Sequence, residues 1–337
     1  MDYFNFAIDL DGSNVRIYKF GMGIVLSEKA LVIVSKKSNY TKVVDAGDSV
    51  MQYVGKLDKS YQIVSPIKNG RIIDIDICAQ MINMLLEKLE DGFFKKKRNI
   101  VFLVPCGLND KEISDYRDLG YSLSSKEIAV VTKVLAISKY NSLKNKLANM
   151  ILYIGEDFLD VAVVYDHKII KGYTVDLGIN NLSEQLTNYI MDAKGIEVSD
   201  SVLTDIRNDM ATILPNDVIE ERYLGVDAYS KVCTEFTISS LEVLEIYLSY
   251  INELCDIIDV IIKSLSKEVI AELKVSGIIV AGELTELTGL SKYFKNRLGV
   301  PVEISDKPRY SALLGIGHIL GDKIEVTKIS VRPNTGK

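Results

Sequence analysis

The 337-residue sequence is poor in the residue types on which most enzyme active sites depend. It has two histidines, His167 and His318, so a histidine-based triad or a multi-histidine metal site would have to use one of two scattered residues. Neither G-x-S-x-G nor G-x-x-x-x-G-K-S/T occurs. The many aspartates and glutamates are expected to form solvated faces. The sequence therefore indicates no catalytic residue and no metal ligand.

Cysteines and long apolar runs are also scarce, and the chain has no net positive charge. Four cysteines lie in apolar segments without C-x-x-C spacing and are expected to be reduced core residues: Cys78, Cys106, Cys233 and Cys255. No uncharged run approaches the roughly 20 residues of a membrane span, and the acidic start does not resemble a signal peptide. A net charge of −6 gives no electrostatic basis for binding nucleic acid. We expect a cytoplasmic globular protein.

A duplicated hairpin is the most informative feature that is present. Residues 6–18 contain an apolar strand, a tight polar turn and a second strand, and residues 150–163 repeat this arrangement. Each copy is followed by another short strand, at 23–26 and at 169–173. The repeat predicts an α/β protein with two lobes, each a mixed sheet flanked by helices, around a central cleft. In folds of this kind the paired turns hold nucleotide phosphates through backbone N–H groups.

Two helices can be placed by their apolar spacing. One covers roughly residues 77–89, and a longer one begins at Ser239, where Glu242 completes a capping box. The apolar stripe of the long helix runs to Leu265. It is expected to pack against the second sheet, with a partner-helix surface as the alternative.

The order of several short segments resembles that of MreB, the bacterial actin-like filament protein. The matching segments are Asp9–Val15 with Gly21–Glu28, Pro66–Asp76, Leu103–Gly107, Glu235–Ser240, Gly277–Leu284 and Gly299–Val302. The resemblance implies a duplicated two-lobe actin/Hsp70-like fold. It places the first lobe at residues 1–145, the second at 146–325 and a C-terminal tail at 326–337.

The residues that match the family's nucleotide cleft depart from its pattern. Asp11 stands where the family has glycine, and Tyr153, Glu156 and Asp157 replace its second aspartate and glycine run. The expected cleft residues are Asp9, Asp11, Gly12, Ser13, Asn14, Gly155, Glu156, Asp157, Gly282 and Glu283. An acid 4 Å from a phosphate costs about 1 kcal/mol in water and several times that in a partly buried cleft. The resemblance with these departures implies no ATP hydrolysis, no metal and no cofactor beyond weak ATP or Mg²⁺ binding.

Two further family positions are also changed. The segment that carries the family's water-positioning glutamate reads Thr132-Lys133-Val134, and the triple glycine near the base reads Gly282-Glu283-Leu284. The helix that carries the adenine-contacting glutamate in the family reads Ser201–Asp205 here. These changes strengthen the expectation of a degenerate nucleotide site.

One local cluster is the best candidate for a working surface. Two phenylalanines precede four cations between the first helix and the next strand: Phe93, Phe94, Lys95, Lys96, Lys97 and Arg98. One interpretation is a charged loop with a phenylalanine tucked into a neighbouring groove. The resemblance favours another, because the same hairpin tip in MreB inserts adjacent apolar residues into the bilayer. It implies a membrane-facing loop near residues 91–98.

Three functions therefore remain open. The first is a non-hydrolysing MreB-like scaffold that assembles with itself or with an MreB homologue on an anionic membrane, at the inner face of the cell membrane. The second is an actin-superfamily ATPase that forms its own filaments. The third is a regulatory adaptor similar to FtsA. The segment Pro66–Asp76 and the layout of the second half favour the first.

Overall fold

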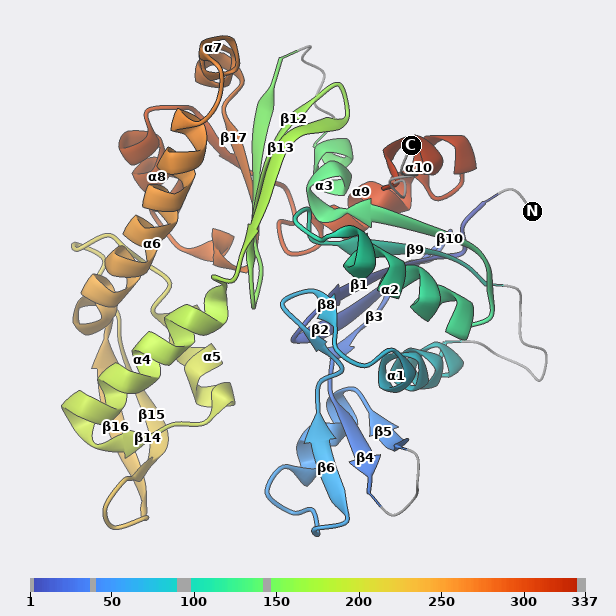
Figure 1. The fold of residues 1–337 in the computed structure, drawn as a ribbon. Coiled ribbons are helices and arrows are strands. Elements are labelled where there is room, and N and C mark those ends of the chain that lie inside the picture. Colours follow the sequence, from blue (N-terminus) through green and yellow to red (C-terminus); the bar gives the residue numbers. More distant parts are fainter. Residues whose placement is uncertain (1–2, 37–40, 90–97, 142–146, 332–337) are drawn as a thin grey trace.

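The computed structural model describes residues 3–36, 41–89, 98–141 and 147–331 of the chain. They form two lobes that lie side by side (Figure 1). The first lobe contains a five-stranded sheet in the order β10-β9-β1-β2-β3. Its strands are β1 (Phe6–Asp11), β2 (Asn14–Lys19), β3 (Gly23–Lys29), β9 (Arg98–Val104) and β10 (Ser125–Thr132).

The second lobe repeats this plan. Its five-stranded sheet has the order β13-β12-β11-β17-β18. The strands are β11 (Asn149–Ile154), β12 (Leu159–Tyr165), β13 (Lys168–Val175), β17 (Ile278–Gly282) and β18 (Val302–Ile304). In both sheets an antiparallel three-strand meander is joined through its first strand to a parallel pair. The duplication predicted from the two hairpins is therefore confirmed.

Helices cover the outer face of each sheet. On the first lobe they are α1 (Ile75–Glu87) and α2 (Asp110–Ser122). On the second lobe they are α6 (Ser240–Lys263), α7 (Lys267–Ser276) and α8 (Leu290–Leu298), with the 3₁₀ turn η2 (Glu283–Glu286) after β17. Helices α4 (Ile179–Lys194) and α5 (Asp200–Asp209) lie farther down this lobe (Figure 1), where α4 contacts α6 and α5 contacts β15 (Glu220–Asp227) of a small sheet. The predicted capping box of α6 is present, since Ser239 and Glu242 each bond the other's backbone N–H.

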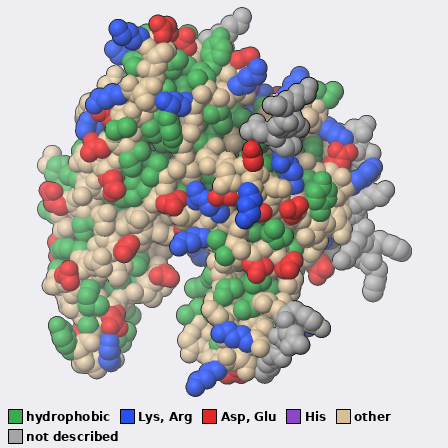
Figure 2. All heavy atoms as spheres, in the orientation of Figure 1, with side chains coloured by type: hydrophobic (Ala, Val, Ile, Leu, Met, Phe, Trp, Pro, Cys, Tyr) green, Lys and Arg blue, Asp and Glu red, His purple; other side chains and the backbone are tan. Residues whose placement is uncertain are grey.

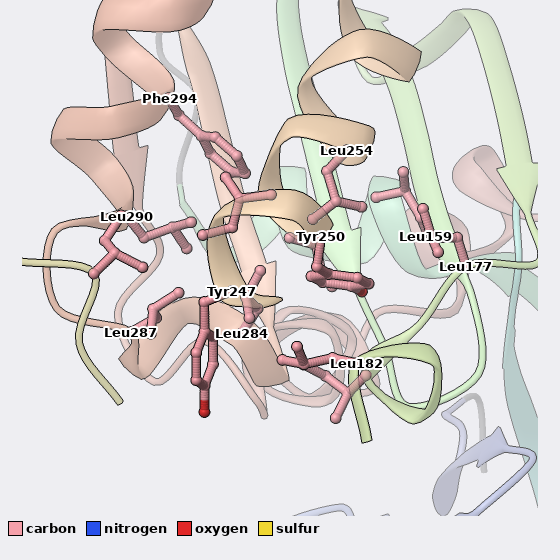
Figure 3. Close-up of a cluster of buried hydrophobic side chains, with 14 of the residues drawn as sticks. Leu159, Leu177, Leu182, Tyr247, Tyr250, Leu254, Leu284, Leu287, Leu290 and Phe294 are labelled. Carbon is pink, nitrogen blue, oxygen red and sulfur yellow. The ribbon is translucent and has the colours of Figure 1, made fainter. Parts of the chain in front are cut away.

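The apolar core of the second lobe explains the long helical stripe. Tyr247, Tyr250 and Leu254 of α6 are at most 2% exposed. Tyr250 and Leu254 lie between Leu159 of β12 and Phe294 of α8, and Tyr247 lies beside Leu284 and Leu287 (Figure 3). Side chains three and four positions apart share one helix face, so this stripe fills the space between helix and sheet. The stripe therefore packs against the second sheet.

A central core lies between the two sheets. Alternate residues of a strand point to opposite faces, so Ile8 packs with α1 and α2 while Ala7 faces the centre. The centre is filled by α3 (Lys133–Tyr140) and α9 (Ser311–Ile319), which pack closely on each other. This shared layer joins the lobes.

The C-terminal part of the chain returns to the first lobe. Helix α9 contacts β1, β2 and β3, and α10 (Lys323–Ile329) contacts β10. Val331 then donates a backbone hydrogen bond to Val130 of β10. The sequence places the end of the second lobe at residue 325, whereas the structure has the chain back on the first lobe by Ser311.

At the bottom of the view in Figure 1, each lobe ends in a small antiparallel sheet. A notch separates these two ends of the molecule (Figure 2). The first comprises β4 (Val32–Ser35), β5 (Lys42–Ala46) and β6 (Tyr61–Val64), with the 3₁₀ helix η1 (Asp48–Tyr53) and the hairpin β7 (Ile67–Lys68) and β8 (Arg71–Ile72) nearby. The second comprises β14 (Ile196–Glu197), β15 (Glu220–Asp227) and β16 (Cys233–Ser239).

The expectation for the cysteines is corrected at one position. All four are free; Cys78 and Cys255 are buried and Cys106 is partly buried against the central core, but Cys233 is exposed because it lies on the outward face of β16. Among the described residues, none of the helices is both long and apolar enough to cross a membrane.

Candidate functional site

The two duplicated turns meet at the cleft and bond to each other through side chains. The Ser13 hydroxyl donates to Asp157 Oδ1 at 3.3 Å, and the Asn180 amide donates to the same oxygen at 2.6 Å. Gly12 has a φ of +46°, and a side chain there would collide with the Asp157 carboxylate. The turns therefore face each other as predicted, but the space between them is bridged by protein groups.

Asp11 does not face the cleft. Its side chain is 0% exposed, and Oδ2 accepts a hydrogen bond from the Tyr153 hydroxyl at 2.6 Å. The same oxygen lies 3.4 Å from Lys133 Nζ and 3.6 Å from Arg16 Nη1. The sequence places the Asp11 carboxylate beside the phosphate position, and the structure adds that this carboxylate is buried and that two cations, Lys133 and Arg16, lie against it.

Lys133 is the centre of this buried cluster. Its side chain is 0% exposed, and Nζ lies 2.8 Å from Asp9 Oδ1. Nζ also donates to the Tyr153 hydroxyl at 3.3 Å and lies 5.1 Å from the centroid of the Phe158 ring. Lys133 opens α3 directly after β10, so a residue from the first lobe contacts β11 of the second. We call Asp9, Asp11, Arg16, Lys133 and Tyr153 the buried ion cluster.

The protonation of the cluster follows from burial and these charges. Burial alone would raise the pKa of Asp11, but Lys133 and Arg16 lower it below its usual value. Burial would lower the pKa of Lys133, but Asp11 and Asp9 raise it. Asp9 has its pKa raised by burial, which Lys133 offsets only in part. Lys133 and Asp11 are therefore both charged at neutral pH.

A second bridge between the lobes extends the cluster. Arg16 Nη2 of β2 donates to Glu283 Oε1 of η2 at 2.7 Å, and both side chains are less than 9% exposed. Arg309 Nε lies 3.0 Å from the other oxygen of Glu283, and Arg309 Nη2 lies 2.8 Å from Glu286. Glu283 thus holds two arginines, one from each side of the cleft.

A third polar joint lies where β9 ends. Asp160 of β12 accepts hydrogen bonds from the Cys106 backbone N–H at 3.0 Å and the Thr174 hydroxyl at 2.5 Å. The Gly107 backbone N–H in turn donates to the Thr174 hydroxyl at 2.8 Å. Burial raises the pKa of Asp160 to about 6. These contacts form a further polar link between β12 and β13 of the second lobe and the segment after β9 of the first.

Two spaces open near the duplicated turns, an outer cleft between the lobes and an inner pocket within the second lobe. The larger is a cleft of about 650 Å³, lined by both turns and by residues of α4 and α5. The smaller is a pocket of about 100 Å³ bounded by Glu156, Arg207, Tyr247, Glu283 and Arg309. Sites for drug-sized ligands usually have 300–1,000 Å³. The outer cleft therefore has room for a small molecule, whereas the inner pocket is below that range.

Acids border both spaces. Burial raises the pKa of Glu156, and the nearby Glu283 raises it further. Burial and the charge of Asp11 likewise raise the pKa of Asp157. The part of the chain that the structure describes contains no group of three or more histidine, cysteine, aspartate or glutamate side chains arranged to hold a metal ion.

The remaining predicted cleft residues have mainly backbone roles. Gly155 N–H donates to the Phe158 carbonyl and shapes the second turn. Gly282, with φ +102°, leaves no room for a side chain against the Ile154 backbone. Asn14 begins β2 opposite Asp11. All lie around the meeting point of the two turns.

Sequence reasoning missed the cations that complete the site. Lys133 was visible as a replacement for the family's glutamate, but it was interpreted only as the loss of an acid. Arg16 and Arg309 carried no local signal, because their partner Glu283 is 267 and 26 residues away along the chain. These cations pair with acids from distant segments of the chain, and a local sequence pattern does not reveal such pairs.

The expected membrane loop lies mostly outside the described residues, including Phe93, Phe94 and Lys95 to Lys97. Arg98 is described and requires a correction. It is 4% exposed at the start of β9, and its Nη1 donates to Asn83 Oδ1 at 2.6 Å. Arg98 is therefore part of the folded lobe and is not a free cation of the loop.

Comparisons with known proteins agree on one family. The family model described as MreB/Mbl protein matches residues 3–328. The chain is 26% identical over 330 residues to the cell shape-determining protein Mbl of Bacillus subtilis (strain 168), covering 96% of this chain and 98% of that protein. It is 22% identical over 320 residues to the cell shape-determining protein MreB of Escherichia coli (strain K12), with coverages of 93% and 92%.

Solved structures give the same fold. The crystal structure of MreB5 of Spiroplasma citri bound to AMPPNP matches with a TM-score of 0.86 at 18% identity, covering 96% of this chain and 97% of that one. A MamK double helical filament matches with a TM-score of 0.75 at 15% identity, with coverages of 93% and 97%. These likenesses establish an actin-like fold with mixed sheets and flanking helices.

Proposed function

Because this chain belongs to the MreB/Mbl family of cell-shape cytoskeletal proteins, we propose that it is a filament scaffold that does not hydrolyse ATP. It assembles with itself or with an MreB homologue at the inner face of the cell membrane. The observation that carries the proposal is the buried ion cluster, which joins the lobes through the chain's own side chains. In this proposal the contacts of the buried ion cluster hold the two lobes together, which is the role of the bound nucleotide in an ATP-dependent filament protein.

The charges in the cleft support this proposal. Mg·ATP requires open backbone N–H groups and a position for the metal beside the phosphates. Here Asp157 lies against Gly12, and Lys133 holds the carboxylates of Asp9 and Asp11. The residues do not fit Mg·ATP in this arrangement, and no acid stands at position 133 to orient a water molecule.

The main alternative is an ATP-dependent filament protein. The Spiroplasma relative was crystallised with AMPPNP, and the outer cleft of this chain has room for a ligand. It would require Lys133, Arg16 and Glu283 to exchange their partners on binding. Each of these side chains is less than 9% exposed and ion-paired, so that exchange costs several kcal/mol.

Assembly provides the first test. Longitudinal contacts in this fold depend on complementary lobes and not on hydrolysis. We expect filaments of the full chain, alone or mixed with an MreB homologue, in equal amounts with ATP, with ADP and with EDTA and no nucleotide. Sedimentation and negative-stain electron microscopy measure this. A strict monomer at tens of micromolar in every mixture, or filaments that form only with ATP, would contradict the proposal.

Membrane association is the second part of the proposal. Phe93 and Phe94 would each contribute about 1.5–3 kcal/mol if fully buried in the headgroup region, and Lys95 to Lys97 about 1 kcal/mol each near an anionic leaflet. Replacing both phenylalanines by alanine is expected to abolish co-sedimentation with anionic liposomes. Tyr121→Ala is the control variant, because it removes another aromatic side chain that is 66% exposed near the end of α2. Equal pelleting of the wild type and the double variant would show an ordinary solvated loop.

A further inference from the structure

The turn between β2 and β3 projects from the first lobe with two exposed apolar side chains. Phe20 is 43% exposed and Met22 is 65% exposed. Neither belongs to a hydrophobic core of the described residues. Gly21 and Gly23 have φ of +76° and +87°, and no described atom lies within 4 Å of a Cβ added at either position. The tip of the turn therefore stands in open space.

The base of the turn is held by the sheet. Phe20 N–H donates to the Asn5 carbonyl at 2.8 Å, and Met22 N–H donates to the Lys19 carbonyl at 2.9 Å. The ring centroid of Phe20 lies 5.1 Å from that of Tyr3. The backbone on both sides of the tip is thus bonded, so the exposure of its apolar side chains is a property of the fold.

The turn lies beside both ends of the proposed membrane loop. Before the loop, the Leu89 carbonyl accepts a hydrogen bond from Lys19 Nζ at 3.4 Å. After it, the Asn99 carbonyl accepts from Asn5 N–H at 2.9 Å, and Asn5 in turn accepts from Phe20. Two steps between neighbouring strands span about 10 Å. A surface that contacts the loop therefore passes close to the turn.

Charge and area select a bilayer as the partner of the turn. From Asn14 to Ser27 the sequence contains Arg16 and Lys19 but no acid, so this hairpin does not repel an anionic surface. A stable protein–protein interface buries about 800 Å² per partner, which two side chains do not supply. At a membrane a few apolar side chains contribute by entering the headgroup and acyl boundary, to a depth of about 5–10 Å.

We propose that the β2–β3 turn is a second contact with an anionic lipid bilayer, in which Phe20 and Met22 enter the boundary between headgroups and acyl chains. The proposal rests on the membrane association in the proposed function and adds an orientation to it. The six residues of β1 run from this edge of the sheet to Asp11 at the cleft, over about 20 Å. The cleft is therefore turned away from the lipid.

The sequence contains no tryptophan, so one introduced tryptophan reports on one position. Full-length Met22→Trp is mixed with vesicles of phosphatidylcholine and phosphatidylglycerol in equal parts, with and without bromine on the acyl chains. We expect its emission to shift to shorter wavelength and to be quenched by the brominated lipid. Tyr229→Trp is the control, at a position that is 92% exposed between β15 and β16 of the second lobe, and should show neither change.

A smaller substitution measures the size of the contribution. Met22→Ala leaves the backbone contacts of the turn in place, so its circular dichroism and Tm should equal those of the wild type. It should lower the partition coefficient onto the same vesicles about tenfold, because an apolar side chain no longer enters the lipid. Val260→Ala trims a side chain of α6 that is 67% exposed, and it should leave the partition coefficient unchanged.

Three results would overturn the proposal. The first is co-sedimentation of Met22→Trp with unchanged emission, in which case the loop binds the membrane without the turn. The second is an equal shift for Tyr229→Trp, which would show adsorption without orientation. The third is a wild type that does not co-sediment, which also contradicts the membrane part of the proposed function. Conversely, a shifted and quenched Met22→Trp supports the turn even where Phe93→Ala with Phe94→Ala pellets like the wild type and the loop alone fails.

Discussion

Replacing Lys133 by methionine is expected to lower the free energy of unfolding by about 3–5 kcal/mol. Methionine keeps the volume and the apolar contacts with Tyr153 and Phe158 but removes the charge. Asp11 then keeps the hydrogen bond from the neutral Tyr153 hydroxyl and the more distant cation Arg16, whose Nη1 lies 3.6 Å from it. Removing one partner of a buried ion pair is costly because the remaining charge stays out of water. Urea unfolding monitored by circular dichroism measures the loss.

The pH dependence separates this electrostatic effect from a packing defect. Without the lysine, burial raises the pKa of the unpaired carboxylates in the folded state above that in the unfolded chain. A group with a raised folded pKa destabilises the protein at high pH and ceases to do so once it is protonated. The difference between Lys133→Met and the wild type should therefore shrink as the pH falls from 7 toward the acid range.

A matched surface variant gives the scale of an ordinary ion pair. Lys263 is paired with Asp259 one helical turn away, and its side chain is 72% exposed. Lys263→Met is expected to change stability by less than about 1 kcal/mol. If Lys133→Met loses no more stability than Lys263→Met, the buried ion cluster does not hold the lobes together.

The largest expected functional effect is the absence of tight ATP binding. The inner pocket of about 100 Å³ is bordered by Glu283, which is paired with Arg16 and Arg309. The phosphate turns are bonded to each other through Ser13 and Asp157. A nucleotide would have to break these contacts, and it would bring its phosphates close to Glu156 and Asp157, which form no salt bridge with any described residue. Both the free energy needed to break the cleft contacts and the repulsion between the phosphates and these acids lower the affinity for ATP.

Much of the fold could be predicted from local pattern. The alternation of apolar residues in 6–18 and 150–163 specified two hairpins, and their repetition specified two lobes. Ser239 and Glu242 marked the start of α6 because a capping box is local. The first helix was predicted at 77–89 and observed at Ile75–Glu87, since helix ends depend on contacts that periodicity does not report.

The candidate site was predicted less completely, for a physical reason. The sequence located Asp11, Asp157 and Glu283 at the cleft, but it did not reveal where their charges point. Asp11 is neutralised by residue 133, which is brought to it by the parallel pairing of β10 with β9 and of β9 with β1. Such pairing between distant segments leaves no periodic signal. For the same reason Arg98 was grouped with the lysines before it, although it begins a buried strand.

Isothermal titration calorimetry of the full-length chain with ATP and Mg²⁺ tests the central claim most directly. We expect no saturable heat at micromolar protein, and a parallel assay should show no phosphate release above that of a blank. A relative that binds AMPPNP, such as the Spiroplasma MreB5, serves as the positive control under the same conditions. A stoichiometric complex with a dissociation constant at or below about 10 µM, equivalent to roughly −7 kcal/mol, would contradict the account.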